Sequence, residues 1–271
     1  MNRIAQSLFL GAAVVTATFG AAQAHRAWLM PSTFVLSGDE QWVTVDGAIS
    51  NDLFFPNHVA MSLDDIKVMA PNGSIADTEN GAMVKFRTVF DVKLDQQGTY
   101  KIVNGGGGYF ASWTENGERR RQRGSLEELV AAGVDKKEGA QLMRSSRRVE
   151  TFVTLGAPTE TVFKPSGDGL EMVPVTHPND VYAGESVAFK FLASGTPAVG
   201  LDVTIVKGQD RYRDTVDEVI VKTDAEGVVH FTLDEPGRYW LSADQGGEIT
   251  VEGRKMSHRM SYVAIFEALP L

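Results

Sequence analysis

Residues 186–192 read SVAFKFL, and this short stretch decides the class of fold. Val187, Phe189 and Phe191 recur at every second position, so an extended chain presents all three on one face. Strict alternation is the pattern of a half-buried strand in a sheet with one covered face. The stretch therefore predicts a β-strand whose aromatic side chains enter a core.

The same period recurs on both sides of this stretch. Turn signals such as Thr223–Gly227 and Pro236-Gly237 separate the further predicted strands of the second half, which are 202–206, 219–222, 228–233, 238–243 and 261–268. This seven-strand style of pattern resembles immunoglobulin-like or carboxypeptidase-regulatory-like sandwiches. In the first half the predicted strands are 42–45, 67–70, 84–90 and 98–103, with turns at 71–73, 79–81 and 96–98.

Residues 105–147 break this pattern. Gly105–Gly108 is typical of a hinge or tight bend, and Ser125 with Glu128 forms a helix-capping pattern. We therefore expect a helical insertion at about 105–147, a long excursion that carries one or two short helices. Seven arginines in or beside this region predict either an anion site or, because acidic residues interleave with them, a solvated charged face: Arg119, Arg120, Arg121, Arg123, Arg144, Arg147 and Arg148.

The sequence as a whole predicts a mainly β protein made of two antiparallel β-sandwich modules, residues 25–160 and 161–271, with a helical excursion in the first. Residues 1–24 stand apart as a signal peptide. A basic start, an apolar run and the small-x-small pattern Ala22-Gln23-Ala24 predict export to the periplasm and cleavage after Ala24. No other segment is apolar enough to span a bilayer, so we expect no stable membrane insertion after cleavage.

Charge and cysteine content narrow the functions. Of 271 residues, 26 are Lys or Arg and 35 are Asp or Glu, so the net charge is −9, and −10 once Arg3 is removed. This acidic balance argues against nucleic-acid partners. The chain has no cysteine, which excludes disulfides, thiolate metal sites and thiol catalysis. A metal ion would be held by His, Met, carboxylates, backbone or water.

His25 is the most informative of the five histidines. Cleavage after Ala24 makes it the first residue, so its free α-amino nitrogen and its ring Nδ1 can chelate one metal ion. Nickel, cobalt and copper suit such nitrogen-rich sites. His58, in the aromatic loop Phe54–His58, is the only other histidine of the first module and hence the expected second ligand.

His258 is a further candidate ligand. On a strand it would share one face with Met256 and Met260, a soft donor set suited to Cu(I), although methionines on a strand face are more often core residues. His177, in a turn, is expected to be structural, and His230, opposite Val229 and Phe231, to face solvent. Familiar catalytic motifs are missing, so no catalytic residues are predicted and the protein is expected not to be an enzyme.

The residues after the predicted cleavage site carry a resemblance. His25-Arg26-Ala27-Trp28-Leu29-Met30-Pro31-Ser32 fits the pattern Ala-His, two residues, Trp-Leu, one residue, Pro-Ser. It resembles the mature start of a bacterial domain-of-unknown-function family described as periplasmic components of cobalt or nickel transport systems. The second half is similar as well, in Leu170–Pro174, Asn179, Gly184-Glu185, Phe191, Gly195 with Pro197, Gly200, Thr223-Asp224 with Gly227, and Pro236-Gly237 with Tyr239. The resemblance implies a two-part periplasmic protein that handles a transition metal through His25, and His58 matches a histidine of that family.

Three functions follow from the sequence. The first is a periplasmic protein that captures a divalent ion, nickel or cobalt, and presents it to a membrane metal transporter. The second is a copper protein similar to histidine-brace proteins, built from His25 with His58 or His258. The third is a structural or carbohydrate-binding sandwich without metal, with a stacking surface drawn from Trp28, Trp42, Trp113 and Trp240.

Overall fold

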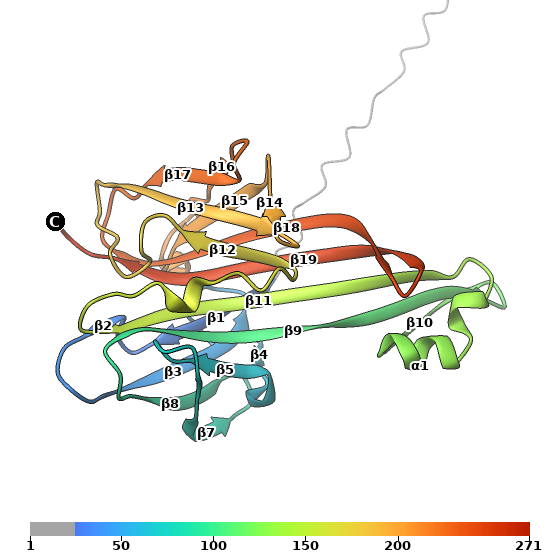
Figure 1. The fold of residues 1–271 in the computed structure, drawn as a ribbon, viewed down its shortest axis with the longest axis horizontal. Helices are drawn as coiled ribbons and strands as arrows, with labels where there is room; N and C mark the ends of the chain where they lie inside the picture. The colour runs from blue at the N-terminus through green and yellow to red at the C-terminus, as the bar shows by residue number, and fades with distance from the viewer. Residues whose placement is uncertain (1–24) are drawn as a thin grey trace, which may run out of the picture.

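The computed structural model describes residues 25–271, whose strands form three stacked layers (Figure 1). The predicted signal peptide lies outside the described residues. The lower sheet contains β1 (Arg26–Pro31), β3 (Gln41–Ser50), β4 (Val59–Ala60), β7 (Thr78–Met83) and β8 (Thr88–Leu94). The upper sheet contains β12 (Leu170–Pro174), β13 (Ser186–Ala193), β14 (Thr196–Pro197) and β17 (Val228–Thr232).

Between these two lies a central sheet of ten strands. Its strands come from both halves of the chain: β2 (Val35–Leu36), β5 (Ile66–Met69), β6 (Ile75–Ala76), β9 (Gly98–Glu115), β10 (Glu118–Gly124), β11 (Gln141–Leu155), β15 (Asp202–Lys207), β16 (Val219–Lys222), β18 (Gly237–Val251) and β19 (Arg254–Ala268). The short helices are α1 (Leu126–Ala131) and four 3-10 turns, η1 (Leu63–Asp65), η2 (Val134–Lys136), η3 (Thr161–Phe163) and η4 (Asp210–Tyr212). None of the helices described here is long and apolar enough to cross a membrane.

The stretch 186–192 forms β13, as predicted. Val187, Phe189 and Phe191 are buried in the upper core, and the Phe189 ring meets the rings of Phe231 and Phe266 edge-on at centroid distances of 5.6 and 5.7 Å. Edge-to-face aromatic pairs at this spacing add to the stability gained by burial alone. The mainly β class predicted from the sequence is confirmed.

The central sheet has two apolar faces because its side chains alternate. On β19, Tyr262 and Phe266 enter the upper core, whereas Val263 and Ile265 enter the lower core with Trp28. Successive residues of β19 therefore contribute alternately to the upper and the lower core. The two predicted sandwiches therefore share one sheet.

One parallel pairing joins the two halves of the chain. β11 pairs with β19 in parallel from Met143↔Ser257 to Thr151↔Ile265, and with β9 antiparallel on its other side. Most other strand pairs are antiparallel, as expected. The division into modules at about residue 160 stays a prediction, since the central sheet draws strands from both sides of it.

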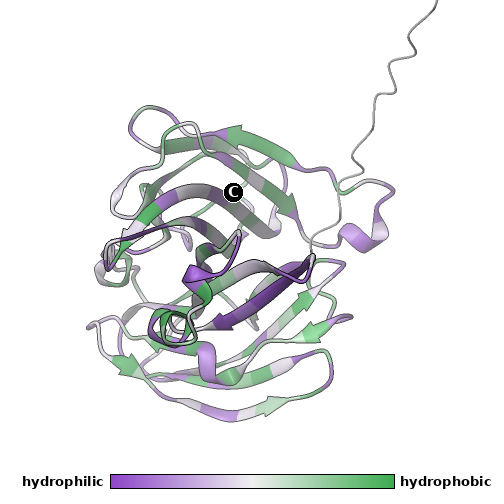
Figure 2. Cartoon of the chain, turned by 90° about the vertical axis from the view of Figure 1, so that its right-hand side faces the viewer, coloured by the Kyte–Doolittle hydropathy of each residue, from purple (hydrophilic) through white to green (hydrophobic). Residues whose placement is uncertain are grey.

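The predicted excursion at 105–147 carries the short helices expected of it, but strands fill most of its length. Gly105–Gly108 lies inside β9, and β10 and much of β11 fill the region, leaving α1 and η2 as its only helical turns (Figure 1). The capping box of Ser125 and Glu128 is present at the start of α1. β10 is hydrophilic along its length (Figure 2). Its sequence therefore lacks the alternation of apolar and polar residues by which a strand is predicted.

The glycine run has a packing role that a hinge would not explain. A Cβ on Gly107 would lie 2.3 Å from the backbone oxygen of Ser145 on β11. No side chain fits at that distance, so glycine permits the close approach of β9 to β11.

The predicted strand 84–90 and the turn 79–81 are also displaced. β7 runs through 79–81, with an irregular register that Asn80 accommodates at a φ of 52°. The chain turns instead at 84–87, before β8. Asn tolerates the left-handed conformation that both turns and bulges require. The sequence pattern of this bulge is therefore the same as that of a turn.

We expect Gly107→Ala to lower the free energy of unfolding by about 1–3 kcal/mol, because the new methyl group must push β9 away from β11. Urea unfolding monitored by circular dichroism measures this. Gly246→Ala is the matched control, since a Cβ there meets no atom within 4 Å. Equal stability of the two variants would contradict the packing role of Gly107.

Candidate metal centre

The structure brings His25 and His58 together. Their rings stack with a centroid distance of 3.7 Å and an interplanar angle of 11°. Ala27 on β1 and Val59 on β4 both pair with Ile49, from opposite sides of β3. The end of β3 is thus flanked by the two segments that carry the histidines, and both side chains are exposed there.

The loop between β3 and β4, residues 51–58, is held by its own polar groups. The Asn57 side chain accepts a hydrogen bond from the Asn51 backbone N–H at 2.9 Å and donates one to Asp52 Oδ2 at 2.9 Å. Ser50 Oγ accepts from the buried indole N–H of Trp28 at 2.7 Å. These bonds fix the residue beside His58 and reduce the entropy that ligand binding would otherwise cost.

Asp210 ties both histidine-bearing segments to the second half of the chain. This carboxylate, in η4, accepts from Arg26 Nη1 at 2.8 Å and from the Leu53 backbone N–H at 2.9 Å. Arg26 follows His25, and Leu53 belongs to the loop that ends at His58. Asp210 is 7% exposed, so the ion pair is largely shielded from water. Glu218 accepts a second hydrogen bond from Arg26, at 2.8 Å.

The two histidines offer an incomplete donor set. Imidazole lone pairs lie in the ring plane, so two parallel rings do not aim at one point, and one ring must rotate about χ2 before both bind an ion. Within residues 25–271, no group of three or more His, Asp or Glu side chains is arranged to hold a metal ion. A site here would need the α-amino nitrogen of His25, which exists only in a chain cleaved after Ala24.

His258 lies apart from this pair. Met256, His258 and Met260 do share one face of β19, as predicted, and all three are buried. That face packs toward the upper sheet, whereas His25 lies on the opposite side of the central sheet with Ser261 and Val263. The His258 Nε2 contacts Ser146 Oγ at 2.8 Å. The structure therefore does not join His258 with His25.

The remaining histidines have the roles expected of them. His230 is exposed on β17, between buried Val229 and Phe231. His177 is tied to its surroundings: its Nδ1 accepts from the Asn179 backbone N–H at 3.1 Å, and its Nε2 lies 3.0 Å from Thr99 Oγ1. Burial lowers the pKa of His177 below its ordinary value, and the bond that Nδ1 accepts also favours the neutral ring.

The tryptophans do not form a common stacking surface. Trp28, Trp113 and Trp240 are 2%, 8% and 8% exposed, whereas Trp42 is 44% exposed. Trp240 instead closes the lower core, and its indole N–H donates to the backbone oxygen of Ala27 at 3.0 Å. The carbohydrate-binding hypothesis therefore keeps only one exposed tryptophan.

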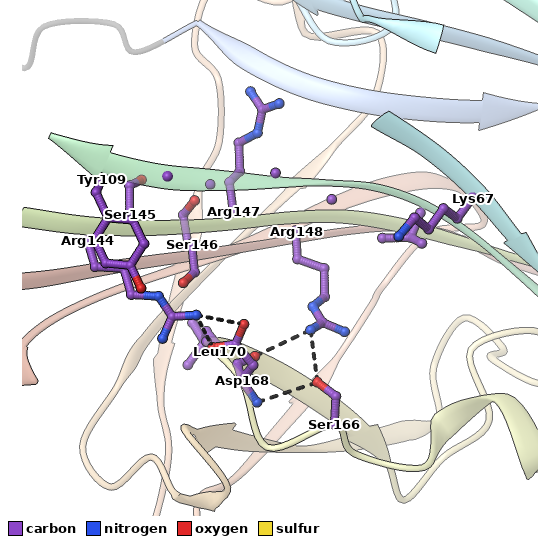
Figure 3. Close-up of a pocket in the computed structure, with 17 residues that line it drawn as sticks. Lys67, Tyr109, Arg144, Ser145, Ser146, Arg147, Arg148, Ser166, Asp168 and Leu170 are labelled. Atoms are coloured by element: carbon purple, nitrogen blue, oxygen red, sulfur yellow. Dashed lines mark hydrogen bonds and ion pairs between the residues drawn. The ribbon is translucent and has the colours of Figure 1, made fainter. Parts of the chain in front are cut away.

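The arginine-rich region is divided among several contacts. Arg144 and Arg148 point into a cavity of about 440 Å³ and contact the segment that holds Ser166 and Asp168 (Figure 3). Arg148 also lies 3.4 Å from each of two buried carboxylates, Glu150 and Glu171. These charges are compensated, as a charged structural face requires. Arg147 points away from this group (Figure 3).

One feature of the site, Asp210, was missed by the sequence analysis. Asp210 lies more than 150 residues from either histidine in sequence, and no local motif marks it. Arg147, one of the seven arginines considered as an anion site, lies outside the histidine pair, and only the alternation along β11 sets it apart from Arg144 and Arg148. The role of Asn57 beside His58 was visible in principle, since Asn side chains commonly organise loops.

Comparison with known proteins gives a family without an assigned activity. Residues 22–247 match the family described as "Domain of unknown function (DUF4198)". No curated protein sequence matches the chain.

Comparison with solved structures gives low similarities. Trypsin-activated alpha-2-macroglobulin from Escherichia coli is 12% identical with a TM-score of 0.23; the match covers 89% of this chain and 16% of that chain. The D0-D1 domain of intimin is 12% identical with a TM-score of 0.20, covering 86% and 96%. The ectodomain of mouse nectin-like molecule 4 is 7% identical with a TM-score of 0.19, covering 91% and 64%. Similarities this low carry no functional argument.

We expect Asp210→Asn to lower the free energy of unfolding by about 3 kcal/mol. The substitution removes the buried negative charge that pairs with the guanidinium of Arg26 in a shielded position. Urea unfolding measures this. The matched control is Asp202→Asn, which breaks an ion pair with Lys222 between side chains that are 64% and 61% exposed, and should cost less than about 1 kcal/mol. A similar small loss of unfolding free energy in both variants would contradict the stabilising role of Asp210 beside the two histidines.

We expect stability to fall as pH decreases through 6.5, in part because of His177. The unfolded chain, with an ordinary histidine pKa of 6.5, takes up a proton there, whereas the folded chain, with its lowered His177 pKa, does so only at lower pH. Urea unfolding from pH 7.5 to 5 should show a shallower decline for His177→Gln. His230→Gln, at an exposed position, should keep the decline of the parent protein. An unchanged slope in His177→Gln would contradict this assignment.

Proposed function

The chain belongs to the DUF4198 family, and we propose that it is an exported protein that binds a transition-metal ion at its mature N-terminus. The observation that carries the proposal is the contact between His25 and His58, with ring centroids 3.7 Å apart. The donors would be the α-amino nitrogen and Nδ1 of His25 together with one ring nitrogen of His58. We further propose that the metal is nickel or cobalt and that the protein passes it to a membrane transporter in the periplasm.

The chemistry of the donors supports this proposal. Imidazole and amine nitrogens suit Ni²⁺, Co²⁺ and Cu²⁺, and a five- or six-atom chelate loses less entropy than separate ligands. Asp210 and Asn57 hold the two segments in place from outside the ring contact. Because only three nitrogens are supplied, the ion would keep open positions for water or a carrier molecule. Open positions suit capture and transfer of the ion.

Copper is the second candidate metal. A terminal histidine beside a second histidine also resembles a histidine brace, and the affinity order of divalent ions places copper above nickel and cobalt at any nitrogen site. The alternative that pairs His25 with His258 loses support, since the two lie on opposite sides of the central sheet. We propose a binding protein and not an enzyme for either metal.

The test is a calorimetric titration with Ni(II) of protein that begins at His25. One extra alanine before His25 turns the α-amino nitrogen into an amide, so affinity should fall by a factor of about 100 or more, the loss of one chelating donor. His58→Gln should also weaken binding. His230→Gln is the matched control and should bind as the parent protein does.

Equal affinity in the extended and parent proteins would overturn the chelate. Titrations with Co(II) and Cu(II) under the same conditions rank the metals. If none of the three ions binds the parent protein or raises its melting temperature, the metal-free sandwich hypothesis replaces this proposal.

A further inference from the structure

A groove runs from His25 along the face of the central sheet that looks toward β1. Its volume is about 780 Å³, large enough for a small organic molecule beside a metal ion. β1 and the segment 216–218 form its walls, and β11, β18 and β19 form its floor. His25 and Arg147 both line it.

Strand register places polar side chains in rows across the floor. Arg147 pairs with Ser261, which pairs with Asp244 on β18, so the three form one row. In the next row, Arg259 lies beside Ser145. The floor thus carries two guanidinium groups, with the serines and Asp244 of these strands and the apolar side chains of Val149, Val263 and Trp240 around them.

Most charges around the groove are already paired. Arg26 forms ion pairs with Asp210 and Glu218. Asp217 Oδ2 lies 3.6 Å from Arg213 Nε. Within residues 25–271, by contrast, neither Arg147 nor Arg259 forms an ion pair with a carboxylate. Arg147 is half-buried, and its guanidinium donates to Asn104 Oδ1 at 3.0 Å. An arginine without a carboxylate partner in a groove has donors left for an anion.

Asp244 is the opposing charge. It keeps solvent contact, yet loss of hydration in the groove raises its pKa above the ordinary value, and Arg259 acts in the opposite direction. One carboxylate facing two guanidinium groups leaves the floor with a net positive charge.

From this geometry we propose that the groove binds an organic carboxylate through Arg147 and Arg259, and that this anion fills open positions of the metal at His25. The inference rests on the proposed metal site and names its substrate class: a metal ion carried by a small polycarboxylate. The carboxylate would pair with the guanidinium groups while its other oxygens stay on the ion. The apolar residues of the floor would exclude water and strengthen these contacts.

The experiment is equilibrium dialysis of protein that begins at His25 against Ni(II) with radiolabelled citrate. A protein that binds only the bare ion loses nickel to citrate, whereas the proposed site retains one nickel and one citrate together. Arg147→Gln should weaken citrate retention by about tenfold or more, the loss of one charged hydrogen-bonding partner. Its binding of Ni(II) without citrate should be unchanged. Arg259→Gln provides a second variant at an exposed position, where folding is not at risk.

Asp244→Asn gives a test of opposite sign, since removing the negative charge should strengthen citrate retention. Arg121→Gln is the control, because it makes the same charge change on β10, outside the groove. If the protein binds Ni(II) but retains no citrate, or if Arg121→Gln matches Arg147→Gln, this inference is overturned and the metal site stands. If Ni(II) does not bind, the metal proposal fails. Dialysis with citrate alone then tests whether the groove binds a carboxylate, and citrate retention that does not depend on Arg147 overturns this inference.

Discussion

The rest of the fold depends on the parallel pairing of β11 with β19. It joins strands from the two halves of the chain in one sheet, so both cores are built on opposite faces of the same strands. On the upper face it brings Tyr262 to Glu150, whose Oε2 accepts a hydrogen bond from the phenol O–H at 2.8 Å, and burial raises the Tyr262 pKa well above its ordinary value. On the lower face it places Arg147 next to Ser261. The candidate groove exists because of this junction.

The proposed metal site depends on a second long-range constraint. His25 and His58 immediately precede β1 and β4, two strands of the lower sheet, and Asp210 of the second half contacts both of their segments. A buried carboxylate that bonds a guanidinium and a backbone N–H costs hydration free energy, which is recovered only when both partners are in place. Order at the histidine pair is therefore coupled to the folding of the whole chain. This coupling suits a site that must be formed before the ion arrives.

Strands with one covered face were readable from the sequence, and long-range contacts were not. Alternation gave β13 and the exposed position of His230, because each depends only on the period of an extended chain. It failed on β10, where charged residues occupy both faces, and at Gly105–Gly108, where glycine serves a close strand contact and not a bend. The pairing of His25 with His58 followed from elimination among five histidines. Asp210 and Arg147 acquire meaning only through tertiary structure.

The most direct test of the account is an X-ray absorption spectrum of nickel-loaded protein that begins at His25. Scattering from imidazole rings reports how many histidines bind the ion. The account predicts two rings in the parent protein and one in His58→Gln, with His258→Gln unchanged from the parent. A spectrum with no imidazole scattering, or one that stays the same when His58 is replaced, would contradict the claim that His25 and His58 hold the metal together.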